Sequence, residues 1–332
     1  MARHTGNGYY VQAPADSSWY GGADVGDLLI QARQAQEAKE RKQRRIVGFI
    51  AFIVVVIFVA VIGLVSYRSI AKRNAAQNVT EDQAYSALQG VKLKPKFAND
   101  KGGILFSKAG YGKKTANAPT LEIYTDPMCP GCAVLHQQMD ATLRALLDSG
   151  QINLEIHPVT FLDNMSTDHY SSRADNGVAY IASNDPDPNH LLDFITNIHS
   201  DDFQPEEAAD YKPVNNRQLQ EQAMAAGVPE DIASKAFGNE YEPWLSAAAQ
   251  YTLRRPELKD IGGQFKGKLT TPVVVINGKM LDISGISDIG LTYKVAILQS
   301  IGLANEDIGV AGKQPAIGAD GNPTFPKTQP SA

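Results

Sequence analysis

Hydrophobic positions follow three different patterns along the 332 residues of the chain. Residues 46–67 form an almost wholly apolar run with no charged side chain. Residues 102–302 combine short apolar runs of strand length with stretches in which apolar positions recur at helical spacing. Residues 1–45 and 303–332 are largely polar or rich in Gly, Pro and Ala. They show no sustained apolar period, so we predict largely disordered tails there.

The apolar run 46–67 predicts a transmembrane helix, because about 20 such residues span a bilayer. The alternative is a signal peptide, but its apolar region is usually about 7–15 residues long and follows a short basic start. Five Lys and Arg residues lie within 39–45, and three lie within 68–73. This bias predicts a single-pass cell-membrane protein with a cytoplasmic tail over 1–45 and an extracytoplasmic C-terminal domain. The lipid bilayer is therefore a predicted partner.

Residues 68–101 are predicted to be a linker between the membrane helix and a globular domain that begins near Gly102. Within the linker, Thr80 and Gln83 stand at the spacing of a capping box, which predicts a short helix through Leu88.

The pattern over the globular domain predicts an α/β fold with a large helical insertion over about 163–262. Strands are predicted over 104–106, 121–124, 152–156 and 273–276. Asn277-Gly278 follows the last of these and predicts a hairpin. Helices are predicted from Pro130 to about Ser149, around 174–181, around 191–195, over 219–226, from Pro229, over 243–253 and over 287–301.

Composition adds two points to this picture. The net charge of −5 gives no global basic signal, so no nucleic-acid partner is predicted. The chain contains two cysteines, three positions apart, which is unlike a secreted domain held together by several disulfides.

The two cysteines lie in the sequence Cys129-Pro130-Gly131-Cys132, between a predicted strand and a predicted helix. Pro130 suits the first helical turn, where no backbone N–H is needed, and this places Cys129 at the helix entrance. Free N–H groups and the helix dipole favour a thiolate there, which is a nucleophile toward disulfides. Cys129 is therefore predicted to attack, and Cys132 to resolve the mixed disulfide. Pro130 and Gly131 are predicted to tune the pair.

Other uses of a cysteine pair are a structural disulfide and half of a zinc site. A disulfide at this spacing closes a very short loop and gains little through the entropy of the unfolded chain. A structural zinc ion needs four ligands, and the sequence offers neither a second cysteine pair nor a histidine pair at the required spacing. We therefore predict a redox-active pair and no metal.

The order of elements and motifs resembles the DsbA-like branch of the thioredoxin superfamily in its membrane-tethered bacterial form. The resemblance covers residues 102–302 and rests on the Cys129–Cys132 motif and on Thr271-Pro272 before an apolar strand. It implies a thioredoxin-like fold with an inserted helical subdomain. It also implies a cis bond before Pro272, with Thr271 and Pro272 facing the reactive cysteine and binding the substrate chain. No metal or organic cofactor is implied.

Several positions depart from that family's pattern. Gly131 stands where relatives often have His or Tyr, so no side chain is available there to stabilise the thiolate. Ile123 stands where many relatives bury an acid, and the neighbouring Glu122 would point to the other face of the sheet. We therefore predict Glu122 to be an ordinary polar residue at a sheet margin. Asp126 is predicted to be structural in the turn, and His136 to be a surface residue of the helix.

These observations predict a membrane-tethered, extracytoplasmic thiol–disulfide oxidoreductase that forms or exchanges disulfides in exported proteins. Its predicted partners are exported proteins with cysteines and a membrane redox partner that resets the cysteine pair. A reductase or isomerase is an alternative, because the direction of electron flow depends on a reduction potential that sequence does not give. A binding or chaperone module, with the insertion as its contact surface and an inert cysteine pair, is the alternative from another functional class.

Overall fold

The computed structural model describes residues 79–259, 266–283, 286 and 290–325. Within these ranges, no helix is both long enough and apolar enough to cross a bilayer. The predicted transmembrane helix over 46–67, the predicted tail before it and the first part of the predicted linker lie outside the described residues.

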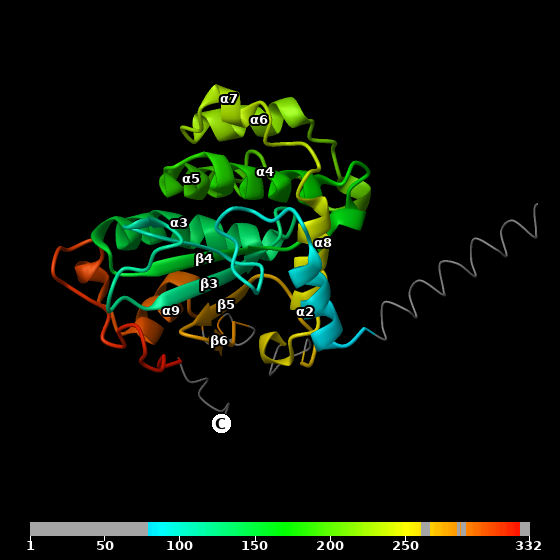
Figure 1. Ribbon diagram of the computed structural model, residues 1–332. Helices are drawn as coiled ribbons and strands as arrows, with labels where there is room; N and C mark the ends of the chain where they lie inside the picture. Colours follow the sequence, from blue (N-terminus) through cyan, green and yellow to red (C-terminus); the bar gives the residue numbers. More distant parts are fainter. Residues whose placement is uncertain (1–78, 260–265, 284–285, 287–289, 326–332) are drawn as a thin grey trace, which may run out of the picture. The chain divides into compact units, whose positions relative to one another are not determined.

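A mixed sheet of six strands, in the order β2-β1-β4-β3-β5-β6, forms the frame of the described domain (Figure 1). Strand β3 pairs with β4 in parallel, and the other neighbouring strands pair antiparallel. The strands are β1 (Ile104–Ser107), β2 (Gly110–Tyr111), β3 (Thr120–Thr125), β4 (Asn153–Pro158), β5 (Val273–Ile276) and β6 (Lys279–Leu281). The four predicted strands and the hairpin at Asn277-Gly278 are confirmed, whereas the very short β2 was not predicted.

Alternation along β3 divides its side chains between the two faces of the sheet. Ile123 is fully buried in the main core, together with the apolar side of the helix that follows β3. Glu122 and Tyr124 point to the opposite face, where Tyr124 packs against Val273. Thr125 follows the alternation and lies on the same face as Ile123.

Helix α3 (Pro130–Ser149) follows β3 directly. Its apolar positions repeat every three or four residues and are fully buried, as the sequence pattern predicted; they are Leu135, Met139, Leu143 and Leu146. The helix ends at Gly150, whose φ of 75° is a left-handed conformation that glycine adopts without steric cost.

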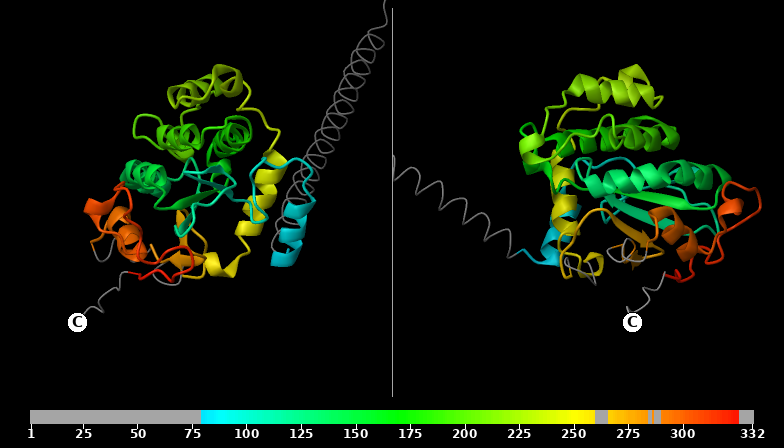
Figure 2. Two further views of the ribbon diagram at one scale, coloured as in Figure 1. Left: turned by 60° about the vertical axis from the view of Figure 1, so that its left-hand side comes forward. Right: turned by 180° about the vertical axis from the view of Figure 1, so that it is seen from behind.

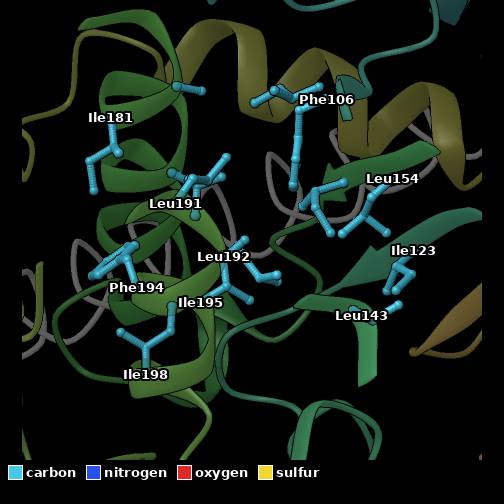
Figure 3. Close-up of a cluster of buried hydrophobic side chains, with 14 of the residues drawn as sticks. Phe106, Ile123, Leu143, Leu154, Ile181, Leu191, Leu192, Phe194, Ile195 and Ile198 are labelled. Carbon is cyan, nitrogen blue, oxygen red and sulfur yellow. The ribbon is translucent and has the colours of Figure 1, made fainter. Parts of the chain in front are cut away.

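Helices fill the chain between β4 and β5 and lie in successive layers over α3 (Figure 1). Helices α4 and α5 form the layer next to α3, and α6 and α7 form the layer beyond it. The bounds are η1 (Asp163–Met165), α4 (Tyr170–Asn184), α5 (Pro188–Ile198), η2 (Ala208–Asp210), α6 (Asn216–Ala225), α7 (Glu230–Ala233), α8 (Glu242–Thr252) and η3 (Pro256–Leu258). The five α-helices predicted for the insertion are confirmed. Figure 3 shows Leu191 and Phe194 of α5 in the same cluster as Leu143 of α3 and Leu154 of β4.

Helix α2 (Glu81–Gly90) packs side by side with α8 (Figures 1 and 2). The predicted capping box is confirmed: Gln83 N donates to Thr80 Oγ1 at 3.2 Å, and Thr80 N donates to Gln83 Oε1 at 3.0 Å. Leu88 is buried in the main core. Part of the segment predicted as a linker therefore belongs to the folded domain, because the apolar side of α2 is covered by α8.

Residues 303–325, predicted to start a disordered tail, instead fold onto the domain. The buried Gln151 side chain donates to the carbonyl oxygens of Asp307 at 2.8 Å and Lys313 at 2.9 Å. Its Oε1 accepts from Gly309 N at 2.8 Å. The Asn277 side chain donates to two further carbonyl oxygens of the segment, those of Gly318 and Gly321. Polar side chains thus bind much of its backbone, and its few apolar contacts follow no period that sequence could reveal.

Helix α9 (Tyr293–Ile301) packs against α3. It begins later than the predicted start at 287, because Gly290 has a positive φ of 68° and Thr292 caps the first turn. It ends at Gly302, as predicted, with a φ of 67°.

Candidate active site

The turn from β3 to α3 places Cys129 at the N-cap of the helix. Asp126 holds this turn, because its Oδ1 accepts from Met128 N and its backbone carbonyl accepts from Cys129 N, both at 3.0 Å. Pro130 occupies the first turn of α3, as predicted. The N–H of Cys132 donates to the Cys129 sulfur, so the helix N-terminus acts on that sulfur directly.

The two sulfurs differ in burial and in pKa. Cys129 is 7% exposed, whereas Cys132 is fully buried. A hydrogen bond from the Cys132 thiol lowers the pKa of Cys129 to about 7 against the opposing effect of burial, and a hydrogen bond from the Thr271 side chain adds to the lowering. Burial, and then the hydrogen bond to Cys129, raise the pKa of Cys132 well above its usual range. This is the asymmetry that an attacking thiolate and a resolving thiol require.

The loop before β5 lies against the cysteine motif. The Thr271–Pro272 bond is cis, as the family resemblance implied. The Cys129 thiol donates to the carbonyl oxygen of Thr271 at 3.3 Å. A Cβ atom on Gly131 would lie 3.2 Å from Pro272 Cδ and 3.4 Å from that same carbonyl oxygen, so glycine allows the loop to approach closely. The structure thus brings together all the residues that the sequence assigned to the site.

Gln204, in the loop after α5, is a site residue that the sequence did not reveal. Its Nε2 donates to the carbonyl oxygens of Pro127 at 3.0 Å and Cys129 at 3.1 Å. The helical insertion is therefore bonded directly to the active-site turn. Gln204 lies 75 residues from Cys129 along the chain, in a polar loop with no motif, and nothing in the sequence pattern marks it.

Asp126, predicted to be structural, is a fully buried carboxyl group next to the cysteines. Besides Met128 N, its carboxylate accepts from Ser171 Oγ at 2.6 Å and from Leu162 N at 2.8 Å. Burial raises the pKa of Asp126 to about 6, although these three hydrogen bonds lower it. Asp126 therefore joins the turn to the loop after β4 and to the first turn of α4.

The prediction that His136 lies on the surface of α3 is wrong, because this side chain is only 1% exposed. Its Nδ1 lies 2.9 Å from Asp140 Oδ1, and its Nε2 lies 3.1 Å from Thr125 Oγ1. The sequence pattern shows one apolar side of α3, but α5 covers a second side of the helix. The packing of α5 on α3 buries the polar residues His136 and Asp140. The spacing of apolar residues along α3 cannot predict this contact, because α5 comes from a distant part of the chain.

On the sheet face away from α3, three side chains form the one group among the described residues that could hold a metal ion: Glu122, Glu155 and His157. Their ligand atoms lie within 4.8 Å of one another. Internal bonds already occupy them, since His157 Nε2 lies 2.7 Å from Glu155 Oε1 and Tyr124 OH donates to Glu122 at 3.2 Å. Glu122 lies on β3, an inner strand of the sheet, so the prediction that it lies at a sheet margin is wrong.

Comparison with known proteins identifies the family of this domain. A family model described as Thioredoxin matches residues 108–288, which is more than half of the chain. The serine/threonine-protein kinase PknE of Mycobacterium tuberculosis is 29% identical over 91 residues, which are 27% of this chain and 16% of the kinase. The chain thus spans about a sixth of the length of this curated relative.

Solved structures with a similar fold include three that are described as disulfide oxidoreductases or Dsb proteins. The reduced form of DsbG from Mycobacterium tuberculosis is 23% identical, with a TM-score of 0.44 over 59% of this chain and 85% of that chain. Reduced DsbA from the same organism is 22% identical, with a TM-score of 0.44 over 57% and 89%. MdbA, a thiol-disulfide oxidoreductase from Actinomyces oris, is 17% identical, with a TM-score of 0.44 over 60% and 89%. On the family match over residues 108–288, the chain belongs to the thioredoxin family.

Proposed function

We propose that the chain is a thiol–disulfide oxidoreductase that forms or exchanges disulfide bonds in exported proteins. One observation carries this proposal: the two cysteines of one motif have opposite environments. Cys129 lies at the helix entrance with its pKa lowered to about 7, and Cys132 is fully buried with a raised pKa. Membership of the thioredoxin family supports the same function.

In the oxidising direction, a substrate thiolate attacks Cys129 of the Cys129–Cys132 disulfide. The bond between the substrate and Cys129 forms, the bond between the two cysteines breaks, and Cys132 leaves as a thiolate that takes up a proton. A second substrate thiolate then attacks the substrate sulfur, and Cys129 leaves as a thiolate. The substrate is oxidised to a disulfide, and its two electrons remain on the enzyme as two thiols. The lowered pKa favours Cys129 as the leaving group in the second step.

Thr271 and Pro272 serve as the substrate-binding loop in this proposal. The Thr271 carbonyl oxygen lies 3.3 Å from the Cys129 sulfur. An extended substrate peptide that pairs with the backbone of Thr271 would bring its own sulfur next to Cys129. This arrangement orients the reacting atoms before the exchange step.

The enzyme is proposed to be tethered to the cell membrane by residues 46–67, with its catalytic domain outside the cytoplasm. The length of the apolar run and the excess of basic residues before it support this topology. Disulfides form and persist in such oxidising compartments. A membrane redox partner would accept the two electrons from the reduced cysteine pair and restore the disulfide.

Trapping of mixed disulfides tests the assigned roles. In cells, Cys132→Ala is expected to accumulate mixed disulfides with exported proteins, because no thiol remains to resolve them. Cys129→Ala, the matched control, is expected to trap few, because the remaining sulfur is fully buried. Non-reducing gels followed by mass spectrometry measure both. Equal trapping by the two variants would contradict the assignment of Cys129 as the attacking cysteine and Cys132 as the resolving cysteine.

Two assays with the purified protein test the direction of electron flow. An oxidase is expected to convert a reduced dicysteine peptide to its disulfide, and a reductase to accelerate the reduction of insulin by dithiothreitol. Activity in neither assay would overturn the proposed function in favour of a binding module.

A further inference from the structure

A chain of buried polar groups leads from Cys132 into the protein, away from the loop at Thr271. The Thr125 hydroxyl acts on the buried Cys132 thiol, since it lowers the pKa of that group against the larger effect of burial. The same Oγ1 lies 3.1 Å from His136 Nε2 and 3.3 Å from His199 Nε2. The two imidazole rings lie against each other, with centroids 4.2 Å apart.

These groups are closed off from solvent. Thr125 is 3% exposed, His136 and His199 are each 1% exposed, and Cys132 is fully buried. Thiol–disulfide exchange requires Cys132 to lose a proton in one direction and to gain it in the other. Because bulk water does not reach this sulfur, the proton has to pass through neighbouring protein groups.

The hydrogen-bond partners of His199 determine its tautomer. Its Nδ1 lies 2.9 Å from the carbonyl oxygen of Ile195, which can only accept, so this nitrogen carries a proton. Burial, together with the nearby His136, lowers the pKa of His199 well below its usual range, which keeps the ring neutral. Its Nε2 is therefore an acceptor and needs the single proton of the Thr125 hydroxyl.

His136 then determines how many protons the network holds. Its Nδ1 faces Asp140 Oδ1 at 2.9 Å, and the other oxygen of Asp140 accepts from Thr196 Oγ1 at 2.7 Å. The single hydroxyl proton of Thr125 is donated to His199 Nε2. The Thr125 oxygen can then only accept from His136, so His136 Nε2 has to carry a proton. Every group then has a partner only when the His136–Asp140 pair holds one proton more than a neutral imidazole beside a carboxylate. With one proton fewer, one buried nitrogen near Thr125 lacks a donor, which is costly. The network therefore favours accepting one extra proton.

We propose that Thr125 and His136 form the proton path of the resolving cysteine, with Asp140 and His199 positioning the path. This inference rests on the proposed function. When Cys132 attacks the mixed disulfide at Cys129, the bond between the two cysteine sulfurs forms. The substrate sulfur leaves with the electron pair of the broken bond.

In the same step the Cys132 proton passes to Thr125 Oγ1, and the hydroxyl proton of Thr125 passes to His136 Nε2. The added proton is then held by the His136–Asp140 pair, whose facing atoms lie 2.9 Å apart. In the oxidising direction the steps run in reverse, and the departing Cys132 thiolate receives the proton. In this path Thr125 exchanges the proton with Cys132, and His136 acts through Thr125.

Two other titratable groups face Cys132 besides Cys129. Asp126, at the end of β3, contacts the sulfur through its backbone N–H at 3.4 Å, while both oxygens of its carboxylate accept hydrogen bonds from other groups. The pKa of Tyr293, on α9, is raised to about 12, chiefly by burial and further by the two cysteines. Its hydroxyl therefore keeps its proton. The side chain of neither group is hydrogen-bonded to the Cys132 sulfur.

The test uses the reduced full-length protein in detergent, mixed with an equimolar aromatic disulfide, dithiobis-nitrobenzoate, in a stopped-flow spectrometer. One coloured thiolate is released when Cys129 attacks the reagent. A second is released when Cys132 resolves the mixed disulfide. The second phase isolates the step to which the proton path belongs, and the first phase reports an intact Cys129 site.

Thr125→Val removes the hydroxyl but keeps the side-chain shape, and His136→Gln removes the imidazole ring. Both variants are expected to slow the second phase on the order of 10²-fold near neutral pH and to shift its pH profile upward. The first phase is expected to be unchanged. Thr125→Ser, which retains the hydroxyl, is expected to restore the second phase. His169→Gln, an exposed histidine paired with Asp163, is the matched control and should behave as wild type.

A second phase that keeps its rate and pH profile in both Thr125→Val and His136→Gln would overturn the proton path. If His136→Gln loses both phases because it misfolds, then the comparison of Thr125→Val with Thr125→Ser decides, since these two differ in the hydroxyl. Equal second phases in that pair would overturn the proposal. If the wild-type protein shows no second phase, then the proposed function itself fails, which is a separate outcome.

Discussion

Cys129 and Cys132 are chemically identical side chains one helical turn apart, and hydrogen bonds and burial make them different. The buried thiol of Cys132 donates to the Cys129 sulfur, so the same contact lowers the pKa of Cys129 and raises that of Cys132. The position of Cys129 lowers its pKa further, because its sulfur accepts a hydrogen bond from a backbone N–H at the N-terminus of α3. The reactivity of Cys129 thus depends on its neighbour as much as on the helix.

This dependence gives a prediction for the titration of Cys129. Its thiolate is expected to form with a pKa of about 7, measured by ultraviolet thiolate absorbance and by the rate of alkylation with iodoacetamide. Cys132→Ala removes the main cause of the lowering, so the pKa is expected to rise toward the ordinary thiol value of 9.0. Cys132→Ser keeps a donor hydroxyl and should preserve most of the shift. A pKa that is the same in wild type and Cys132→Ala would contradict this account.

The lowered pKa also makes the stability of the reduced protein depend on pH. The folded-state pKa of Cys129 lies below the unfolded value, so its contribution is fully present above about pH 9 and is lost as pH falls through about 7. A shift of two units corresponds to roughly 2–3 kcal/mol. Urea unfolding of the reduced protein across this range measures the effect, and Cys129→Ala should remove it.

At the scale of secondary-structure elements, sequence predicted those that repeat an apolar period or carry a strong stop signal. Helix α3 and the hairpin at Asn277-Gly278 are of this kind, since each bears its own pattern. The segment 303–325 and β2 bear none. The predicted surface position of His136 failed for a related reason, because the helix that buries it comes from a distant part of the chain. Local patterns report local structure, and the packing of α5 on α3 is not local.

Gln151 provides a prediction at this scale, because its buried amide bonds three backbone groups of the segment 303–325. Gln151→Ala removes three part-buried hydrogen bonds and is expected to lower the free energy of unfolding by about 2 kcal/mol. Gln299→Ala, at an exposed position on α9, is the matched control and should change it by less than about 0.5 kcal/mol. Guanidinium unfolding measures both. Similar values for the two variants would show that the segment does not depend on Gln151.

At the scale of the whole domain, three segments converge on the cysteine pair. Strand β3 supplies Thr125, the loop before β5 supplies Thr271, and the insertion supplies His199 and Gln204. Sequence located the motif and the loop, because each has a recognisable signature next to an apolar run. It could not locate the residues of the insertion, since their role arises only when α5 packs on α3. The insertion is therefore part of the active site as well as a cover for the sheet.

The membrane topology is a prediction for the whole chain, motivated by the basic residues within 39–45 that precede the apolar run 46–67. In intact cells freed of any outer barrier, external protease is expected to remove a tag placed after Ala332. A tag placed before Met1 is expected to stay protected until the cells are permeabilised. Both tags are read on immunoblots of the same protein.

A charge variant tests whether the basic bias causes this orientation. Replacing the Lys and Arg residues within 39–45 by Gln leaves the three basic residues within 68–73 as the stronger cluster. A fraction of the molecules is then expected to insert in the opposite orientation, because cytoplasmic flanks retain the excess of positive charge. Those molecules should protect the C-terminal tag and expose the N-terminal one. If the unmodified protein already shows that reversed pattern, the Cys129 site faces a reducing cytoplasm, and the proposal of an enzyme acting on exported proteins falls with the topology.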